Sequence, residues 1–417
     1  MSNLPKRLSG GVGGRDLARE CVVVQQPCPA AKPGVAGARG RRYASAVTDA
    51  APDPAFESAK QLFFDGLAAF HAGRFEDAER SFLASLEAVP GRPSTLLNLA
   101  ATRLKLRRPV EAIAAADAVL AAHPDDVDAL SLRAIAHARL GLLDQALAAY
   151  GRVLAVDPSL AEMWSQRGSL LREAGRLDDA ARAFEQAIAR GGDAELNGYF
   201  LAAVRNVTPP LAAPAPYVEG LFDDYSAGFD EHLVGVLGYR AHVVLVDNLP
   251  GLDARRFGSA LDLGCGTGLC GPLVKPHVER LTGVDLAARM LERARALGVY
   301  DRLEHAEVVA WLGANRERFD LIVCADVFIY IGDLAPLFAE VGRALAPGGV
   351  FCFSAELAAR ESDDFSLQPS LRYTHSERYL RGLASRNGFS VARLLQAPIR
   401  QEQRQAIDGL YCYLTRA

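Results

Sequence analysis

A 34-residue repeat between about Lys60 and Ala194 constrains the fold of this 417-residue chain more than any other feature. Small residues open each unit, glycines divide it into two helix-length halves, and a proline ends each of the first three units. The aligned series are Gly66, Ala100, Ala134 and Gly168; Gly73, Gly141 and Gly175; Ala78, Ala112, Ala146 and Ala180; Phe82, Ala116, Tyr150 and Phe184; and Pro90, Pro124 and Pro158. Small side chains let two helices approach closely, and proline stops the second helix. Since one such unit cannot bury its apolar face alone, we predict four stacked helical hairpins.

Composition places boundaries on both sides of the repeats. Residues 1–55 are rich in Gly, Ala, Arg and Pro and lack apolar periodicity, which predicts a disordered leader. A mitochondrial presequence and a wrongly assigned start codon are alternatives for this segment, although Asp16 and Glu20 argue against the presequence. Four prolines within residues 206–216 predict a stiff linker. We therefore expect a repeat domain at residues 56–205 and a second domain at residues 217–417.

The second domain alternates short apolar runs with helix-length amphipathic segments, the pattern of a parallel sheet wrapped by helices. Five runs are expected strands, and a final pair without a helix between its members predicts an antiparallel hairpin at the sheet edge. The expected strands are residues 259–264, 280–285, 302–307, 319–325 and 349–355, followed by the pair 389–396 and 409–416. The predicted fold class is thus an all-α repeat solenoid followed by an α/β domain.

A glycine-rich run, LDLGCGTGLCG at residues 261–271, follows the first expected strand. Glycine at such a place indicates a positive φ or a close approach of a ligand to the backbone. Gly266, Gly268 and Gly271 fit the dinucleotide pattern GxGxxG, with Asp285 at the end of the second strand as a ribose-binding acid. That pattern alone would indicate an NAD-dependent oxidoreductase. Asp262, placed two residues before the first glycine, and the terminal hairpin argue for a different nucleotide-like ligand.

The repeats resemble the tetratricopeptide repeat, which implies a right-handed superhelix whose concave face binds a peptide or another protein. Residues 262–268 resemble motif I of the class I S-adenosylmethionine-dependent methyltransferases, an acid-x-Gly-x-Gly-x-Gly pattern. The likeness covers about residues 221–414, with later motifs at 283–291, 319–334 and 345–356. The two parts together are similar to a group of predicted bacterial methyltransferases that carry tetratricopeptide repeats. The resemblance implies a Rossmann-like seven-stranded sheet and S-adenosyl-L-methionine as the cofactor.

The same resemblance implies which residues bind the cofactor. The motif glycines would lie against its methionine portion, and Asp262 would support that loop and the cationic end of the cofactor. Asp285 would accept hydrogen bonds from both ribose hydroxyls, and Glu307 would accept one from the adenine amine, where the family usually has Asp. A helix N-terminal acid is the alternative for Glu307. The expected contacts are Asp262, Gly264, Cys265, Gly266, Thr267, Gly268, Asp285, Leu286, Ala306, Glu307 and Asp326.

Candidate catalytic residues follow from the chemistry of methyl transfer, an in-line displacement at a carbon that a sulfonium already activates. Orientation and exclusion of water are then the main tasks, and a general base helps when the acceptor is a hydroxyl or a protonated amine. His375 is the first candidate for that base, before Tyr330 and His232, while Asp326 would face the methionine group and the acceptor. A packing or capping role for His375 and an aromatic wall for Tyr330 are the structural alternatives. Residues 221–240 are expected to form a lid helix over the cofactor.

Composition argues against several other functions. The formal net charge is only −4 with interspersed acids and bases, so no nucleic-acid partner is expected. No apolar run approaches the roughly 20 residues that span a bilayer. The seven cysteines form no CxxC pair, so we expect no zinc site, no disulfide framework and a cytoplasmic location. An adaptor with a cofactor-binding but catalytically silent domain is the main alternative function, and no motif identifies the methyl acceptor or the oligomeric state.

Overall fold

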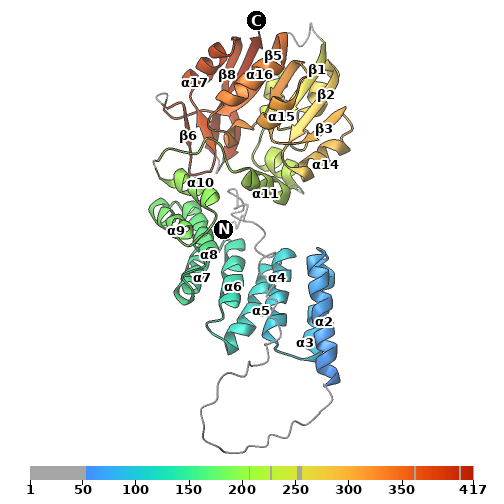
Figure 1. The fold of residues 1–417 in the computed structure, drawn as a ribbon, viewed down its shortest axis with the longest axis vertical. Coiled ribbons are helices and arrows are strands. Elements are labelled where there is room, and N and C mark those ends of the chain that lie inside the picture. Colours follow the sequence, from blue (N-terminus) through green and yellow to red (C-terminus); the bar gives the residue numbers. More distant parts are fainter. Residues whose placement is uncertain are drawn as a thin grey trace, which may run out of the picture. The chain divides into compact units, whose positions relative to one another are not determined.

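The computed structural model of the chain describes residues 53–205, 207–225, 228–250, 256–360, 363–402 and 405–416 (Figure 1). The predicted leader, apart from its last three residues, lies outside the described residues. By its internal contacts the described chain divides into a first unit, residues 53–174, and a second unit that begins at Gly175. No helix among the described residues is long and apolar enough to cross a membrane.

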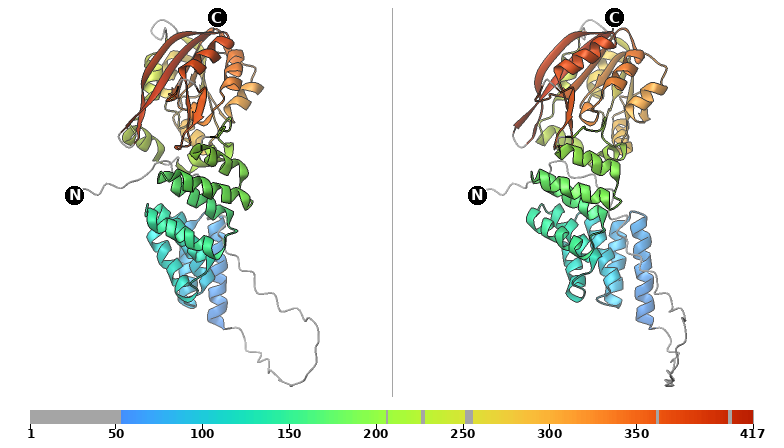
Figure 2. Two further views of the ribbon diagram at one scale, coloured as in Figure 1. Left: turned by 90° about the vertical axis from the view of Figure 1, so that its left-hand side faces the viewer. Right: turned by 60° about the vertical axis from the view of Figure 1, so that its left-hand side comes forward.

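The first unit is a stack of antiparallel helices, which Figure 2 shows from two further directions. Its members are α2 (Pro54–His71), α3 (Phe75–Ala88), α4 (Pro93–Lys105), α5 (Pro109–Ala122), α6 (Val127–Arg139), α7 (Leu143–Val156) and α8 (Ala161–Glu173). Consecutive helices pack together, and α4 also contacts α2 and α6, the first helices of the neighbouring hairpins. The predicted helical-hairpin repeat is therefore confirmed.

The repeated residues do what their size and conformation predicted. A Cβ on Gly66 would lie 2.5 Å from the ring of Phe82, so only glycine allows α2 and α3 to approach this closely. Gly73 and Gly141 turn the chain between the two helices of their units with φ of +73° and +70°. In the second unit of the repeat, Arg107 holds the same position with φ of +59°. The turn geometry is thus kept even where glycine is absent.

The second unit contains a seven-stranded sheet in the order β3-β2-β1-β4-β5-β9-β8. Its strands are β1 (Phe257–Leu263), β2 (Val278–Asp285), β3 (Arg302–His305), β4 (Phe319–Cys324), β5 (Leu345–Glu356), β8 (Phe389–Glu402) and β9 (Gln405–Arg416). The first five strands are parallel, and β9 pairs antiparallel with both β5 and β8. The predicted sheet and terminal hairpin are confirmed; Figure 2 shows that hairpin in dark red.

Alternation along the strands builds two apolar layers, one on each face of the sheet. Ile322 and Phe351 belong to the layer that includes α15 (Val308–Ala314), α16 (Ala335–Ala344) and α17 (Glu377–Arg386). Leu321 and Cys352, one residue away, belong to the layer that includes α12 (Ala241–Asp247) and α13 (Gly271–Val274). Because both faces are covered, the central strands are apolar almost throughout, as expected for parallel strands.

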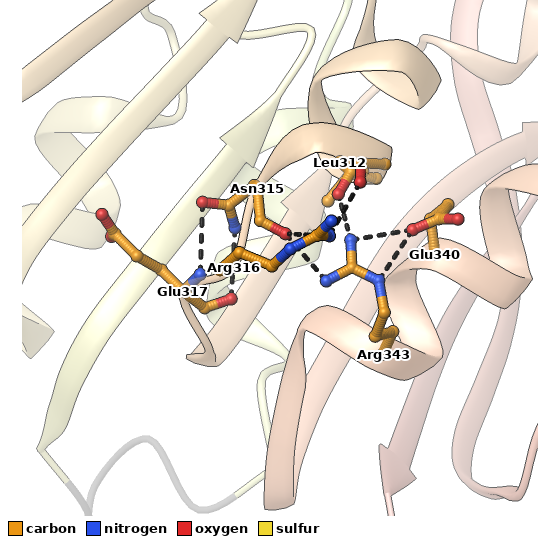
Figure 3. Close-up of polar contacts among 7 residues, drawn as sticks. Leu312, Asn315, Arg316, Glu317, Glu340 and Arg343 are labelled. Atoms are coloured by element: carbon orange, nitrogen blue, oxygen red, sulfur yellow. Dashed lines mark hydrogen bonds and ion pairs between the residues drawn. The ribbon is translucent and has the colours of Figure 1, made fainter.

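One arginine joins the two helices beside β4 at the end of the sheet away from the strand carboxyl ends (Figure 3). Arg343 of α16 donates to the backbone oxygens of Leu312 and Asn315 at the C-terminal end of α15, and to Glu340 of its own helix. Cationic side chains near a helix C-terminus satisfy its last carbonyl groups and oppose its negative dipole end. The contact joins the C-terminal end of α15 to α16.

Two further features of the second unit were not predicted. Strands β6 (Phe365–Leu367) and β7 (Tyr373–His375) form a separate two-stranded hairpin. Helices α9 (Leu177–Ala189) and α10 (Ala194–Val204), which carry the end of the repeat pattern, group with the sheet, and the Tyr199 hydroxyl of α10 donates to the Leu371 oxygen at 2.6 Å. The domain boundary expected at residues 206–216 stays a prediction, since the division by contacts falls earlier in the chain.

Candidate functional site

The glycine loop follows β1 at the carboxyl edge of the sheet. Gly264, Gly266 and Gly268 have φ of +67°, +55° and +93°, a backbone conformation that side chains rarely adopt. A Cβ on Gly264 would lie 2.2 Å from Val327, whereas a Cβ on Gly266 would meet nothing within 4 Å. The loop is therefore packed against the chain that follows β4, and there is open space beside its half-buried backbone at Gly266.

Asp285 ends β2 and holds the glycine loop directly. Its two carboxylate oxygens accept hydrogen bonds from the backbone N–H of Gly266 at 2.7 Å and of Ala287 at 2.8 Å. Burial raises the pKa of Asp285, and the backbone N–H donors oppose that rise. A carboxylate offers about four acceptor positions, so each oxygen retains capacity for a further donor. This geometry is compatible with the predicted contact to two neighbouring hydroxyls.

Asp262, expected to support the loop, faces a residue that the sequence did not single out. It is 1% exposed and accepts a hydrogen bond from the Tyr300 hydroxyl at 2.7 Å. Burial raises the pKa of Asp262 to about 7, although the hydrogen bond from Tyr300 lowers this pKa. The ring of Tyr300 also occupies the space where a Cβ on Gly271 would lie. Tyr300 thus connects Asp262 to the glycine loop, since its hydroxyl bonds to Asp262 and its ring packs against Gly271.

The other predicted loop residues also have partners in the chain. Cys265 is buried, which raises its pKa well above the usual value and keeps the thiol protonated at neutral pH. The Thr267 hydroxyl donates to Asp230 at 2.5 Å. The backbone oxygen of Leu286 contacts His305 Nε2 at 2.8 Å, and the Ala306 N–H donates to the backbone oxygen of Asp285 at 3.0 Å. These contacts connect the carboxyl ends of β1, β2 and β3 to one another.

Glu307 caps a helix. Its side chain accepts from the backbone N–H groups of Val309 at 3.0 Å and Ala310 at 2.7 Å, so it is the N-cap of α15. The alternative role for this residue, a helix N-terminal acid, is therefore present in the structure. Contact with an adenine amine stays a prediction, and it would have to use the remaining acceptor positions of the same two oxygens.

Asp326 follows β4 in a left-handed conformation with φ of +61°. Its N–H donates to the Ser354 hydroxyl at 2.9 Å, and its Oδ1 lies 3.5 Å from Arg400 Nη1. Arg400, on β8, also forms an ion pair with Glu356, the last residue of β5. Three strands thereby bring charged side chains together beside the glycine loop.

The environment of His375 does not fit a general base. The residue is 0% exposed, and its Nε2 donates to the backbone oxygens of Ile331 at 2.9 Å and Gly332 at 3.1 Å. Burial lowers the pKa of His375 to about 4, so the ring is neutral at pH 7. It ends β7, and the following residue, Ser376, caps α17. The packing alternative describes this residue, and the prediction of a catalytic role is not supported.

Tyr330 lies at the end of a short 3-10 turn, η4 (Phe328–Tyr330). Its ring contacts Phe222 edge-to-face with 5.5 Å between centroids, and burial raises the pKa of its hydroxyl far above neutrality. Asp326 raises that pKa further and Arg400 lowers it, so the hydroxyl is within electrostatic reach of both. Tyr330 therefore lines the same edge of the sheet as Asp326, as an aromatic wall with one polar end.

The segment expected as a single lid helix, residues 221–240, holds the end of α11 (Ala215–Tyr225) and the π-helix η2 (Glu231–Val236), and α12 begins only after it. Asp223 accepts from the Arg289 N–H at 3.1 Å, and Asp230 accepts from Thr267 and from Arg293 at 2.7 Å. At the other end, the Gln401 N–H donates to the Leu237 oxygen at 2.8 Å. His232 lies within η2. The described residues of this segment thus contact both the glycine loop and β8.

Family comparisons match the repeat region and the sheet region of the chain separately. Residues 261–353 match the family described as methyltransferase domain, and residues 69–136, 133–195 and 165–213 match tetratricopeptide repeat families. The chain is therefore similar to tetratricopeptide repeat proteins in its first part and to methyltransferase domains in its second. The antiparallel β9 between β5 and β8 also differs from the parallel 3-2-1-4-5-6 order of the dinucleotide-binding fold, which the GxGxxG pattern alone had suggested.

Curated relatives match the methyltransferase part. Nodulation protein S of Rhizobium tropici is 34% identical over 106 residues, 23% of this chain and 42% of that protein. Malonyl-[acyl-carrier protein] O-methyltransferase of Enterobacter lignolyticus is 34% identical over 103 residues, 25% of this chain and 41% of that protein. The matches span less than half the length of these relatives.

Solved structures give distant similarities. Magnesium protoporphyrin IX methyltransferase from Synechocystis PCC 6803 with bound SAM has a TM-score of 0.37 and 18% identity, covering 48% of this chain and 97% of that one. The N-methyltransferase NodS from Bradyrhizobium japonicum WM9 has a TM-score of 0.34 and 22% identity, covering 42% of this chain and 93% of that one.

Among the described residues of this chain, no three His, Cys, Asp or Glu side chains gather as metal ligands.

Proposed function

We propose that this protein is an S-adenosylmethionine-dependent methyltransferase. One observation carries the proposal: the glycine loop after β1, with three positive φ angles, is held by Asp285 at the tip of the adjacent strand. The match of residues 261–353 to a methyltransferase domain supports it. When bound, the cofactor would supply a methyl group already activated by a positively charged sulfur.

The residues at the carboxyl edge fit this cofactor. The backbone at Gly266 is free of neighbours where a Cβ would be, which leaves room for a ligand against the chain. Asp285 would accept from the ribose hydroxyls through the acceptor positions that the loop leaves unused. Asp326 Oδ1 is buried and accepts no hydrogen bond from the described residues, with Arg400 Nη1 3.5 Å away, so it has room for a donor from a ligand.

The chain's own contribution to catalysis is then orientation and exclusion of water. Asp230 of the proposed lid segment ties the glycine loop to α14 (Ala288–Ala296) through Thr267 and Arg293, and we propose that the segment closes over the edge where the strands end. Closing the site in this way strengthens the electrostatic interactions inside it. Asp326 and Tyr330 lie on the side of the site away from Asp285, where an acceptor would approach.

The tetratricopeptide repeats suggest a protein or peptide partner. We propose that this partner is either the methyl acceptor or a protein that brings the enzyme to its acceptor.

The unpaired cysteines of the described residues fit a reducing, cytoplasmic setting.

Calorimetric titration of the full chain tests the proposed cofactor. S-adenosylmethionine and its demethylated product are expected to bind, whereas NAD is not. Asp301 provides a matched control, since its carboxylate is exposed and pairs with Lys275 near the opposite end of β2. Asp285→Ala should abolish measurable binding and Asp301→Asn should leave it unchanged. Binding of NAD alone would overturn the proposal.

A further inference from the structure

Asp230 connects the two parts of the chain that are proposed to hold the cofactor. It lies directly before η2, and its Oδ1 accepts a hydrogen bond from the Thr267 hydroxyl at 2.5 Å. Its Oδ2 forms an ion pair with Arg293 at 2.7 Å. Thr267 belongs to the glycine loop after β1, and Arg293 belongs to α14, which follows β2. A single carboxylate therefore joins the loop after the first strand to the helix after the second.

Asp223 supports the start of the same helix. The N-cap residue of α14 is Ala287, which makes no side-chain capping bond. Asp223 Oδ1 instead accepts from the N–H of Arg289, the second residue of α14, at 3.1 Å, and the Asp223 backbone oxygen accepts from the Arg289 side chain at 3.3 Å. The first N–H groups of a helix have no partner within the helix, and an acidic side chain there is favourable. Asp223 thus replaces the missing local cap from 66 residues away.

Both contacts end beside the backbone groups that hold Asp285. Thr267 follows Gly266, whose N–H donates to Asp285 at 2.7 Å. Ala287, which precedes α14, donates to the other oxygen of Asp285 at 2.8 Å. Thr267 is 4% exposed, so its hydroxyl needs a partner within the chain, and Asp230 provides it. The segment before the sheet therefore supports the same two backbone stretches that orient Asp285.

We propose that Asp223 and Asp230 are positioning residues of the cofactor site, which keep the glycine loop and the start of α14 in the conformation that binds S-adenosylmethionine. This rests on the methyltransferase function proposed above. Asp230 acts through Thr267 and Arg293, and Asp223 acts through Arg289. A site that is already ordered binds more tightly, because the ligand does not have to order the loops on binding.

Calorimetric titration of the full chain with demethylated cofactor tests the proposal. Asp223→Ala and Asp230→Ala should each weaken binding about tenfold, the effect of one hydrogen bond to a charged group. Glu231→Ala is the matched control, since Glu231 is the exposed acid next to Asp230, and it should leave the affinity unchanged. Asp230 makes no capping bond to η2, so its removal leaves the bonds of that helix intact.

The titrations are made below the unfolding transition of each variant, where a loss of global stability by itself leaves the affinity unchanged. Affinities of Asp223→Ala and Asp230→Ala equal to that of Glu231→Ala would overturn the proposal.

The partner of Asp230 provides a second pair of variants. Thr267→Val removes the hydroxyl at nearly constant shape and should weaken binding, whereas Thr267→Ser keeps the hydroxyl and should preserve the affinity. Because Asp230 acts partly through Thr267, the double variant Asp230→Ala/Thr267→Val should lose less than the product of the two single losses. Fully independent losses, or equal affinities of Thr267→Val and Thr267→Ser, would contradict the assigned role.

Hydrogen exchange of the unliganded chain measures the positioning without any cofactor. Asp230→Ala should speed exchange of the amides of residues 264–268, and Asp223→Ala should speed exchange at residues 288–291, each relative to Glu231→Ala. Exchange rates equal to those of Glu231→Ala would refute the positioning role. Failure of the wild-type chain to bind the demethylated cofactor would instead refute the methyltransferase function, whatever the exchange rates.

Discussion

Glycines with positive φ occur both in the turns of the repeats and in the loop of the candidate site, but for different physical reasons. Around the repeat glycines Gly73 and Gly141, an added Cβ would meet nothing within 4 Å. Around Gly264 and Gly268 it would lie 2.2 Å from Val327 and 2.7 Å from Leu297. The repeat turns require only a backbone conformation, which Arg107 also adopts. At Gly264 and Gly268 the site loop requires both the positive φ and the absence of a side chain.

The comparison is tested most strongly at Gly264. In Gly264→Ala the new methyl group would collide with Val327. The alanine backbone would also have to keep a positive φ, which is unfavourable for a residue with a side chain. We expect a loss of about 3 kcal/mol or more of stability in the second unit, combining strain and overpacking. Urea denaturation of the full chain, followed by a probe in the second unit, measures it. A loss no larger than that of Gly141→Ala would break the distinction between the two regions.

The next effect concerns the ligand that the loop is expected to bind. Asp285→Asn keeps the shape of the side chain but removes the charge that holds Gly266 and Ala287. We expect S-adenosylmethionine affinity to fall about 100-fold, corresponding to one or two charge-assisted hydrogen bonds. Isothermal calorimetry measures it, with Asp301→Asn as the control. An unchanged affinity would show that the loop serves the fold alone, as the repeat turns do.

His375, although predicted for catalysis, resembles the repeat glycines in contributing to the fold, since it is buried and bonded to backbone oxygens. Its pKa of about 4 in the folded chain lies below the unfolded value near 6.5, so its contribution to stability is complete above pH 6.5. It is lost as the pH falls from 6.5 toward 4, because the unfolded chain then binds a proton that the folded chain does not.

This linkage gives a measurable difference. Lowering the pH from 7.5 to 5.5 should reduce the wild-type free energy of unfolding by about 1.4 kcal/mol more than that of His375→Gln. Parallel denaturation curves of both proteins at the two pH values provide the comparison. The same pH dependence in both would show that His375 does not titrate in this way.

The smallest effect is expected in the repeats. Arg107→Gly should stabilise the first unit by about 1 kcal/mol, because glycine adopts φ of +59° without the strain of a side chain. Thermal unfolding with a probe in the first unit measures it, and Arg108→Gly is the neighbouring control. Destabilisation by Arg107→Gly would mean that the arginine side chain makes a contribution larger than the relief of strain.

Local patterns were sufficient to predict the architecture. The period of 34 residues, the alternation of strands and helices, and the final pair of strands gave the repeats, the sheet and its antiparallel hairpin. The positions of the glycine loop and Asp285 followed as well, since a strand end and its loop are close in sequence. The β6–β7 hairpin was missed because three-residue strands carry almost no periodicity.

The sequence by itself therefore determined which segments fold as helices and strands, and which acids stand at strand ends. Only the tertiary structure decided how those side chains are used. Tyr300 reaches Asp262 across 38 residues and Arg400 reaches Glu356 across 44, distances over which no local pattern carries information. It also placed His375 inside the core and Glu307 on a helix terminus. Burial and hydrogen-bond partners are set by packing between distant segments, and these fix the chemistry that each side chain can perform.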